Sequence, residues 1–301
     1  MNFKRFQFSL RTILGIMLAL SLLLGLPRIR SIRQHLIAKQ LAKANIGIRA
    51  EKEAPKQPLL SRLFFGDNTY DHVFTIDIFD SKASPSDLRL LQYFPSTRVF
   101  GIENTPEAEH ALEVATHLPN IEILMFKDVT LTEKGLQHLG QLHKLRRLDF
   151  WNIDHKDADF SACSSLENLE QVRFVGTSIG DNEIQWLRNC PKLSEVRIEN
   201  TRISAAGLDQ LGANVNLQKV SLQGVDIQNA PLPRFSTLPS LTWLDIDRSK
   251  IDRKSIEQLN AKLPLAFISI SSDSLMDADA DELVKTFRPR LRISQPSKLL
   301  K

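Results

Sequence analysis

Residues 193–211 read LSEVRIENTRISAAGLDQL, and residues 121–139 read IEILMFKDVTLTEKGLQHL. The two stretches begin 72 residues apart, which is three times 24, and their apolar residues fall at matching places. When the chain is written in rows of 24 residues from Val73, nine rows reach residue 288 without a gap. Similarity to itself at one fixed period is the mark of a repeat architecture, in which each unit buries its apolar side against its neighbours.

Two columns of these rows are apolar throughout. Apolar residues at alternate positions, with a β-branched and aromatic preference, predict a short, half-buried strand in each row. Later apolar pairs three residues apart, such as Leu208 and Leu211, predict one or two helical turns. We therefore expect each row to form a strand, a turn and a short helix, and the rows to stack into one parallel sheet. The fourth column holds Ile76, Phe100, Leu124, Leu148, Val172, Val196, Val220, Leu244 and Ile268, and the sixth holds Ile78, Ile102, Phe126, Phe150, Phe174, Ile198, Leu222, Ile246 and Ile270.

The rows resemble the leucine-rich repeat L-x-x-L-x-L-x-x-x-T-x-I-(T/S)-x-x-G-L-x-x-L. Gly135 and Gly207 precede the helix-facing Leu as in that family, and residues 190–193 (CPKL) resemble the junction of its cysteine-containing, ribonuclease-inhibitor-like subclass. The resemblance implies an α/β solenoid, with a curved parallel sheet on the concave side and short helices on the convex side. His155 departs from the pattern, because it stands where other rows place Ile or Leu, and the ninth column lacks an Asn ladder. Fold resemblance implies little about function beyond binding.

The N-terminal segment 1–27 is predicted to be a signal anchor that forms a transmembrane helix. Residues 12–27 are uncharged but short for a bilayer, whereas residues 6–27, with Arg11 at the interface, are long enough to span it. A cleaved signal peptide and a buried core helix are the alternatives. With the repeats, this anchor resembles bacterial membrane-anchored leucine-rich-repeat proteins. The span is represented by Thr12, Ile13, Leu14, Leu18, Leu22 and Leu26.

The basic residues on both sides of this stretch do not give the asymmetry that sets orientation. N-terminal anchors more often translocate the domain on their C-terminal side, so we expect a single-pass protein of the cell membrane with its repeats outside the cytoplasm. Residues 28–50 read as a basic amphipathic juxtamembrane helix, which could contact anionic lipid, cap the first repeat, or do both. Residues 51–72 are assigned as a linker and N-terminal cap, residues 73–288 as the nine repeats, and residues 289–301 as a basic tail.

The charge distribution and the sequence motifs disfavour several classes of function. The net charge is +4, but residues 1–50 hold nine Lys or Arg and no acid, while residues 51–284 carry 24 basic and 35 acidic residues. Binding of nucleic acid by residues 51–284 is therefore disfavoured, because phosphate binding needs a basic face. We find no catalytic motif, expect no cofactor or metal, and assign the acidic run at 277–282 to a helix start. Cys163 and Cys190 are expected to be buried free thiols, and a disulfide between them is the alternative.

Columns three, five and seven of the rows have no core role, so their chemistry is informative for binding. Exposed aromatic residues beside Arg are typical of binding hot spots. The alternative is that Trp151 covers a turn and that charges pair across strands, for instance Asp149 with Arg173. The sequence thus predicts a membrane-anchored, non-catalytic protein that binds a protein partner through its concave face; the alternative is an envelope structural or adhesion protein that binds glycan or peptidoglycan. The candidate partner-binding residues are Met125, Asp149, Trp151, Arg173, Val175, Glu195, Arg197, Trp243, Asp245 and Phe267.

Overall fold

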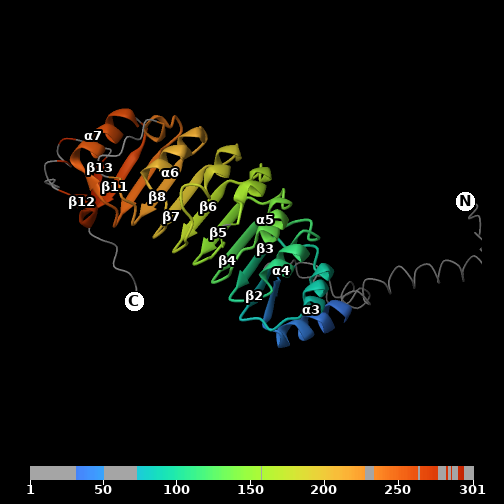
Figure 1. The fold of residues 1–301 in the computed structure, drawn as a ribbon. Helices are drawn as coiled ribbons and strands as arrows, with labels where there is room; N and C mark the ends of the chain where they lie inside the picture. Colours follow the sequence, from blue (N-terminus) through green and yellow to red (C-terminus); the bar gives the residue numbers. More distant parts are fainter. Residues whose placement is uncertain are drawn as a thin grey trace, which may run out of the picture.

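The computed structural model describes residues 32–50, 73–156, 158–227, 234–263, 265–276, 283, 286 and 291–294. Its repeats stack into an elongated solenoid, with strands along one side and short helices along the other (Figure 1). The predicted transmembrane segment 1–27 and the linker 51–72 lie outside the described residues. Among the residues that are described, no helix is both long and apolar enough to cross a bilayer.

An eleven-stranded sheet runs the length of the solenoid in the order β1-β2-β3-β4-β5-β6-β7-β8-β9-β11-β13. From β2 onward the strands are parallel, and from β2 to β11 each residue pairs with the one 24 positions later, as Phe100 does with Leu124. The predicted period and parallel sheet are confirmed. The strands are β1 (Ile46–Ala50), β2 (Val73–Phe79), β3 (Val99–Glu103), β4 (Ile123–Lys127), β5 (Arg147–Trp151), β6 (Gln171–Val175), β7 (Glu195–Glu199), β8 (Lys219–Gln223), β9 (Trp243–Asp247), β11 (Phe267–Ser271) and β13 (Leu291–Ser294), with β10 (Ile251–Asp252) and β12 (Leu275–Met276) in a separate pair.

Short helices cover one face of the sheet. Several rows use a 3-10 helix where others use an α-helix, since one or two turns suffice to bring the apolar side chains onto the sheet. The α-helices are α3 (Pro85–Arg89), α4 (Ala108–Ala115), α5 (Glu133–Gly140), α6 (Ala205–Gln210) and α7 (Arg253–Lys262). The 3-10 helices are η2 (Leu90–Tyr93), η3 (Phe160–Ser165), η4 (Gln185–Asn189), η5 (Leu211–Ala213), η6 (Phe235–Thr237) and η7 (Ser272–Ser274).

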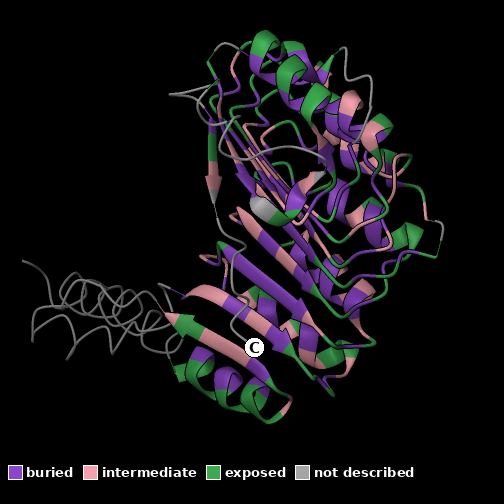
Figure 2. Cartoon of the chain, turned by 90° about the vertical axis from the view of Figure 1, so that its left-hand side faces the viewer, coloured by how far each residue is buried: buried purple, intermediate pink, exposed green. Residues whose placement is uncertain are grey.

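The core lies between the sheet and these helices, and every residue of the fourth and sixth columns is buried in it. Along most strands, buried residues alternate with residues that are partly exposed on the other face (Figure 2), whereas β3 has four consecutive buried residues from Val99 to Ile102. Phe126, Phe150 and Phe174 stack in one line through three rows, with both neighbouring ring planes 8° from parallel. His155 is buried and packs edge-to-face on Phe160, 5.5 Å between centroids, so it serves as a core residue in its row.

The eighth column turns the chain out of each strand. From row to row its residues have a positive φ, between 41° and 72°, a region that favours Gly, Asn and Asp. Neighbouring rows are also joined there, because Asn104 donates to Asp80 Oδ1 and Asn152 to Asp128 Oδ1, both at 2.5 Å. Two pairs of neighbouring rows are therefore joined by Asn–Asp hydrogen bonds in the eighth column, one position before the column in which an Asn ladder was absent from the sequence. The column holds Asp80, Asn104, Asp128, Asn152, Gly176, Asn200, Gly224 and Arg248.

The N-terminal end of the sheet is closed by a helix and an antiparallel strand. Residues 32–43 are helical, and Gln34, Ile37 and Leu41 are buried against the first repeat. This supports the capping role expected for residues 28–50. The extent of the predicted helix was wrong, however: it ends at residue 43, and β1 then pairs antiparallel with β2 because its Ile46 enters the core.

The C-terminal end is closed by a further strand. Leu291 in β13 is buried and pairs with Ile268 of β11, an offset of 23 residues instead of 24. The assignment of residues 289–301 as a basic tail was therefore wrong for Leu291–Ser294, which complete the sheet. The alternation of Leu291 and Ile293, both of which contact the core, is the signal for this strand.

Candidate functional site

The face of the sheet that the helices leave uncovered is formed by columns three, five and seven, and we call it the open face. It corresponds to the concave face of the prediction. All ten candidate binding residues lie on it. Met125, Asp149, Arg173 and Arg197 are direct neighbours on β4 to β7, and Trp151 pairs with Val175. The structure thus brings these residues together in one group, and it places Trp243 beside Phe267 in a second group near the C-terminal end, as the columns predict.

A groove of about 580 Å³ opens on this face across β1 to β5. It exists because Gly47 and Gly101 place no side chain there, while Phe79, Met125 and Trp151 stand around them. Phe79 is 44% exposed and Trp151 is 37% exposed, which is high for large apolar side chains. A mainly apolar hollow with a few polar groups at its border is the usual form of a ligand-binding site.

Two ion pairs form the border of the groove. Arg49 of β1 binds Asp77 of β2, and Lys127 Nζ lies 2.5 Å from Glu103 Oε1. The hydrogen bond from Lys127 to Glu103 raises the pKa of Lys127 above its usual value, so this ammonium stays charged. A Cβ at Gly101 would lie 2.7 Å from Asp77 Oδ1, so a larger residue there would displace the Asp77 carboxylate.

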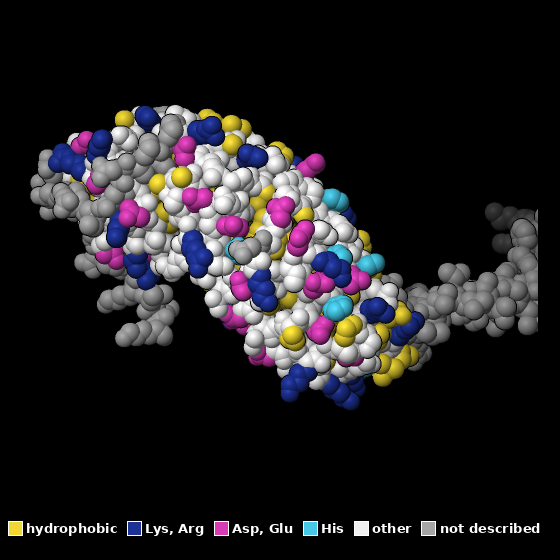
Figure 3. Space-filling model, in the orientation of Figure 1, with side chains coloured by type: hydrophobic (Ala, Val, Ile, Leu, Met, Phe, Trp, Pro, Cys, Tyr) yellow, Lys and Arg dark blue, Asp and Glu magenta, His cyan; other side chains and the backbone are white. Residues whose placement is uncertain are grey.

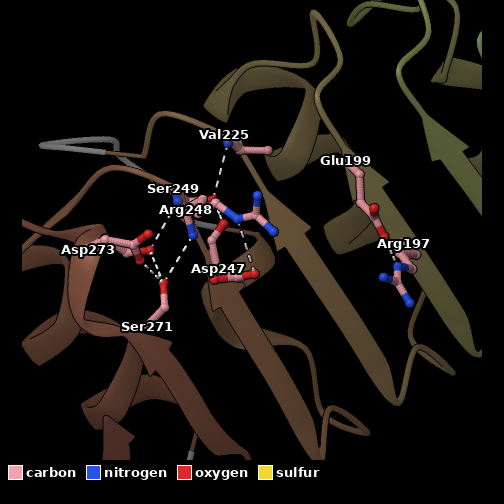
Figure 4. A network of polar contacts seen from close by, with 9 residues as sticks. Arg197, Glu199, Val225, Asp247, Arg248, Ser249, Ser271 and Asp273 are labelled. Atoms are coloured by element: carbon pink, nitrogen blue, oxygen red, sulfur yellow. Dashed lines mark hydrogen bonds and ion pairs between the residues drawn. The ribbon is translucent and has the colours of Figure 1, made fainter. Parts of the chain in front are cut away.

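Next to the groove, β5 and β7 carry ion pairs within single strands. Arg147 Nη2 lies 2.7 Å from Asp149 Oδ2, and Arg197 binds Glu199 in the same way (Figure 4). In both pairs the carboxylate is the deeper group: the Asp149 side chain is 1% exposed against 30% for Arg147. The hydrogen bonds to Asp149 raise the pKa of Arg147. Asp149 therefore supports Arg147 from beneath and forms no pair with Arg173, contrary to the cross-strand pair considered from sequence.

Arg173 lies between these two pairs, with Asp149 and Arg197 as its register partners on the adjacent strands. It is half-buried. Within the described part of the chain its guanidinium makes no ion pair and no hydrogen bond. The middle of the open face therefore holds one arginine whose charge is not matched by a neighbour.

A second aromatic group lies near the C-terminal end. Trp243 stacks on Phe267, with centroids 5.0 Å apart and planes at 24°, and Asp245 is beside them on β9. Trp243 is 45% exposed. Next to this group Arg248 binds Asp247 at 3.6 Å, and its backbone N–H donates to Ser271 Oγ at 3.0 Å, which ties the turn after β9 to β11 (Figure 4).

Elsewhere, charges of both signs are interspersed. On the side seen in Figure 3, basic and acidic side chains are mixed along the solenoid without forming a single basic surface. Ion pairs join neighbouring rows, as in Arg98–Glu122 and Arg146–Glu170. Across the described ranges, no group of three or more His, Cys, Asp or Glu is placed to hold a metal ion. Both cysteines are free and buried.

Of the residues that line the groove, only Met125 and Trp151 were among the predicted binding residues. Gly47, Phe79 and Gly101, which shape the groove, were not among them. Phe79 stands in the seventh column with Trp151, and Gly101 interrupts the fifth column between Asp77 and Met125, so both had a signal in the repeat register. Gly47 had none, because β1 lies outside the rows and was expected to be helical.

The fold is that of a leucine-rich-repeat solenoid, as its 24-residue rows of strand, turn and short helix define. No protein-family model matches the chain, and no curated protein matches it. Among solved structures it is similar to internalin C2 from Listeria monocytogenes, at 17% sequence identity and a TM-score of 0.43, over 76% of this chain and 83% of that chain.

Proposed function

We propose that this chain is a membrane-anchored, non-catalytic protein that binds a protein partner through its open face. The groove bordered by Phe79, Met125 and Trp151 is the observation that carries the proposal. Exposed Trp and Arg are enriched at protein interfaces, and here Trp151, Arg173 and Arg197 lie on three consecutive strands. The exposed aromatic residues have no role in the core, so their placement is explained by contact with a ligand.

The glycan-binding alternative has its own observation. Trp243 stacks on Phe267 beside the carboxylate of Asp245, and an aromatic face with a neighbouring hydrogen-bond acceptor suits a sugar ring. We rank it second, because the groove that carries the proposal lies over β1 to β5 and is not lined by Trp243 or Phe267.

We also propose that residues 6–27 anchor the protein in the cell membrane and that the repeats lie outside the cytoplasm. The helical residues 32–43 support contact with lipid next to such an anchor. Ile32 and Leu36 are 55% and 61% exposed, one turn apart, and Lys39 and Lys43 are exposed on the following turns. Exposed apolar residues followed by lysines fit an anionic membrane surface, while the opposite side of the helix caps the repeats.

Photo-crosslinking tests the binding face. A photoreactive amino acid is placed at Phe79 or at Val175 on the open face, and at Val215 as the matched control, since Val215 is 57% exposed but outside that face. We expect protein adducts, identified by mass spectrometry, from Phe79 and Val175 in source cells and none from Val215. Equal adducts from all three positions, or adducts from none, would show that the open face is not a protein-binding surface.

Two further measurements test the other parts of the proposal. Retention of the wild-type chain, but not of Trp243→Ala, on peptidoglycan would favour the glycan alternative. For topology, a C-terminally tagged chain is exposed to protease in cells with permeabilised outer layers. Loss of the tag is expected; protection in the membrane pellet would place the repeats in the cytoplasm, and release of the tag to the soluble fraction would contradict the anchor.

A further inference from the structure

We infer that the open face binds an extended segment of the partner in which an apolar side chain fills the groove and a carboxylate, four residues away, binds Arg173 and Arg197. This inference rests on the proposed function and specifies the chemistry of the ligand. It joins two features that lie side by side on the sheet, namely the apolar groove over β1 to β5 and the arginines of β6 and β7.

The groove supplies the apolar anchor site. Phe79, Met125 and Trp151 surround a hollow whose base has no side chain at Gly101, so an incoming side chain reaches the sheet itself. The charged residues that line the groove are already paired, Asp77 with Arg49 and Glu103 with Lys127. An apolar side chain therefore enters without breaking an ion pair or leaving an unpaired charge behind.

Arg173 and Arg197 account for the preference of the open face for a carboxylate in the ligand. Arg173 and Arg197 are register neighbours on parallel strands, and like charges directly opposite each other are unfavourable. Glu199 binds Arg197 and Asp149 is bound by Arg147, so these carboxylates offset the charges of Arg197 and Arg147 but form no ion pair with Arg173. Arg173 therefore still has its donors available, and Glu195, two residues before Arg197 on β7, is a partly exposed acidic residue of the same face. A carboxylate between the two arginines would accept charge-assisted hydrogen bonds from both.

The spacing of four residues follows from the sheet. From β3, whose Gly101 forms the base of the groove, to Arg173 on β6 is three strand intervals, or about 14 Å at 4.8 Å each. A peptide that crosses the strands in extended form advances about 3.3 Å per residue, so four residues cover about 13 Å. Residues four apart in an extended chain also point to the same side, which directs both side chains onto the open face.

A selection experiment tests this pattern with a defined probe. The full-length chain in nanodiscs is used to select from a phage-displayed library of random dodecapeptides. We expect enriched peptides to pair an aromatic or large aliphatic residue with Asp or Glu four positions before or after it. A synthetic peptide of the enriched sequence should bind Arg173→Ala about tenfold more weakly or worse than wild type, the range for losing a hydrogen bond to a charged group.

Two charge-reversal variants make the test specific. Selection on Arg173→Glu is expected to replace the acidic residue of the enriched peptides by Lys or Arg. Lys219→Glu is the matched control, since Lys219 is also an exposed cation of the open face but lies on β8, and its selection should give the wild-type pattern. Because the side chains of Arg173 and Lys219 form no ion pair or hydrogen bond with a described residue, both variants should show the circular dichroism of wild type.

The outcomes separate this inference from the proposal on which it rests. Enrichment without the acidic residue, the same acidic pattern on Arg173→Glu, or no enrichment over empty nanodiscs would overturn the inference. Crosslinked protein at Phe79 together with any of these results would leave a protein-binding face with a different ligand chemistry. Absence of crosslinks at the open face would instead remove the proposed function itself.

Discussion

Phe150 stacks on Phe174 with ring centroids 5.4 Å apart, and on Phe126 at 5.6 Å on its other side. The three rings occupy one column of three successive rows and are fully buried. Contact between rows is therefore made by large side chains in direct register, and each row depends on the two beside it.

Truncation of Phe150, the middle ring, should lower the free energy of unfolding. Phe150→Ala removes a buried ring from both stacking contacts and leaves a cavity, which costs about 3–5 kcal/mol of unfolding free energy. The measurement is urea unfolding of the detergent-solubilised chain by far-ultraviolet circular dichroism. Trp151→Ala is the control, because the adjacent side chain is on the open face and its loss should change stability by less than about 1 kcal/mol. Similar losses for both variants would contradict the role assigned to the column.

The eighth-column turn makes a separate prediction about backbone conformation. Gly176 has a φ of +61°, and a Cβ there would meet no atom within 4 Å. Gly176→Ala therefore tests the left-handed conformation alone and should lower the unfolding free energy by about 1–2 kcal/mol. Gly176→Asn should be nearly neutral, since Asn occupies the same column at positions 104 and 152. An Asn variant as unstable as the Ala variant would argue against this explanation.

The ion pair between Arg147 and Asp149 of β5 gives a third prediction. Arg147→Met leaves the buried Asp149 carboxylate without its partner and should lower the free energy of unfolding by about 2–3 kcal/mol. The loss should be smaller than for a fully buried pair, because Arg147 is 30% exposed. Replacing both residues, as in Arg147→Met with Asp149→Leu, should recover most of that loss. A double variant no more stable than the single one would mean that the ion pair itself stabilises the sheet.

The two cysteines give a prediction about pH. Burial raises the pKa of Cys190 to about 12 and raises that of Cys163 as well. In the folded chain both thiols thus stay protonated where unfolded thiols, with a pKa of about 8.5, ionise. Between these pKa values the folded chain binds more protons than the unfolded chain. The contribution of the two thiols to the free energy of unfolding is therefore complete below about pH 8, and it falls as the pH rises from there towards 12.

This pH dependence is measured by urea titrations at pH 7 and pH 10. The wild type should lose more stability between these values than the double variant Cys163→Ala, Cys190→Ala, which lacks the thiols. Both thiols should also resist a thiol reagent at pH 8 until the chain unfolds. Fast labelling of the folded chain, or equal pH effects in both proteins, would contradict the burial of these groups.

The extent to which sequence predicts this structure depends on where each residue lies in the repeat. The strands and core were predictable because two columns stay apolar through nine rows, and the column rule placed Trp151, Arg173 and the other candidates on one face. The closure of both ends was not predictable from the rows, since β1 and β13 are outside the 24-residue register.

The candidate site was predicted in part for the same reason. Met125 and Trp151 belong to the rows, whereas the groove between them also needs β1 and its Gly47. Partner choice within the open face was harder to predict. Asp149 and Arg173 are register neighbours, yet Asp149 binds Arg147 on its own strand, because side chains two apart on a strand also share a face.

The constant offset of 24 residues between paired strands has a consequence for how the protein can change in length. Deletion or duplication of one whole row joins surfaces that already match, since strand meets strand and the eighth-column turn meets its equivalent. Insertion of a single residue within a strand instead reverses which side chains enter the core. Variants with longer or shorter solenoids are thus accessible in steps of a complete row, with the two end strands acting as fixed terminators.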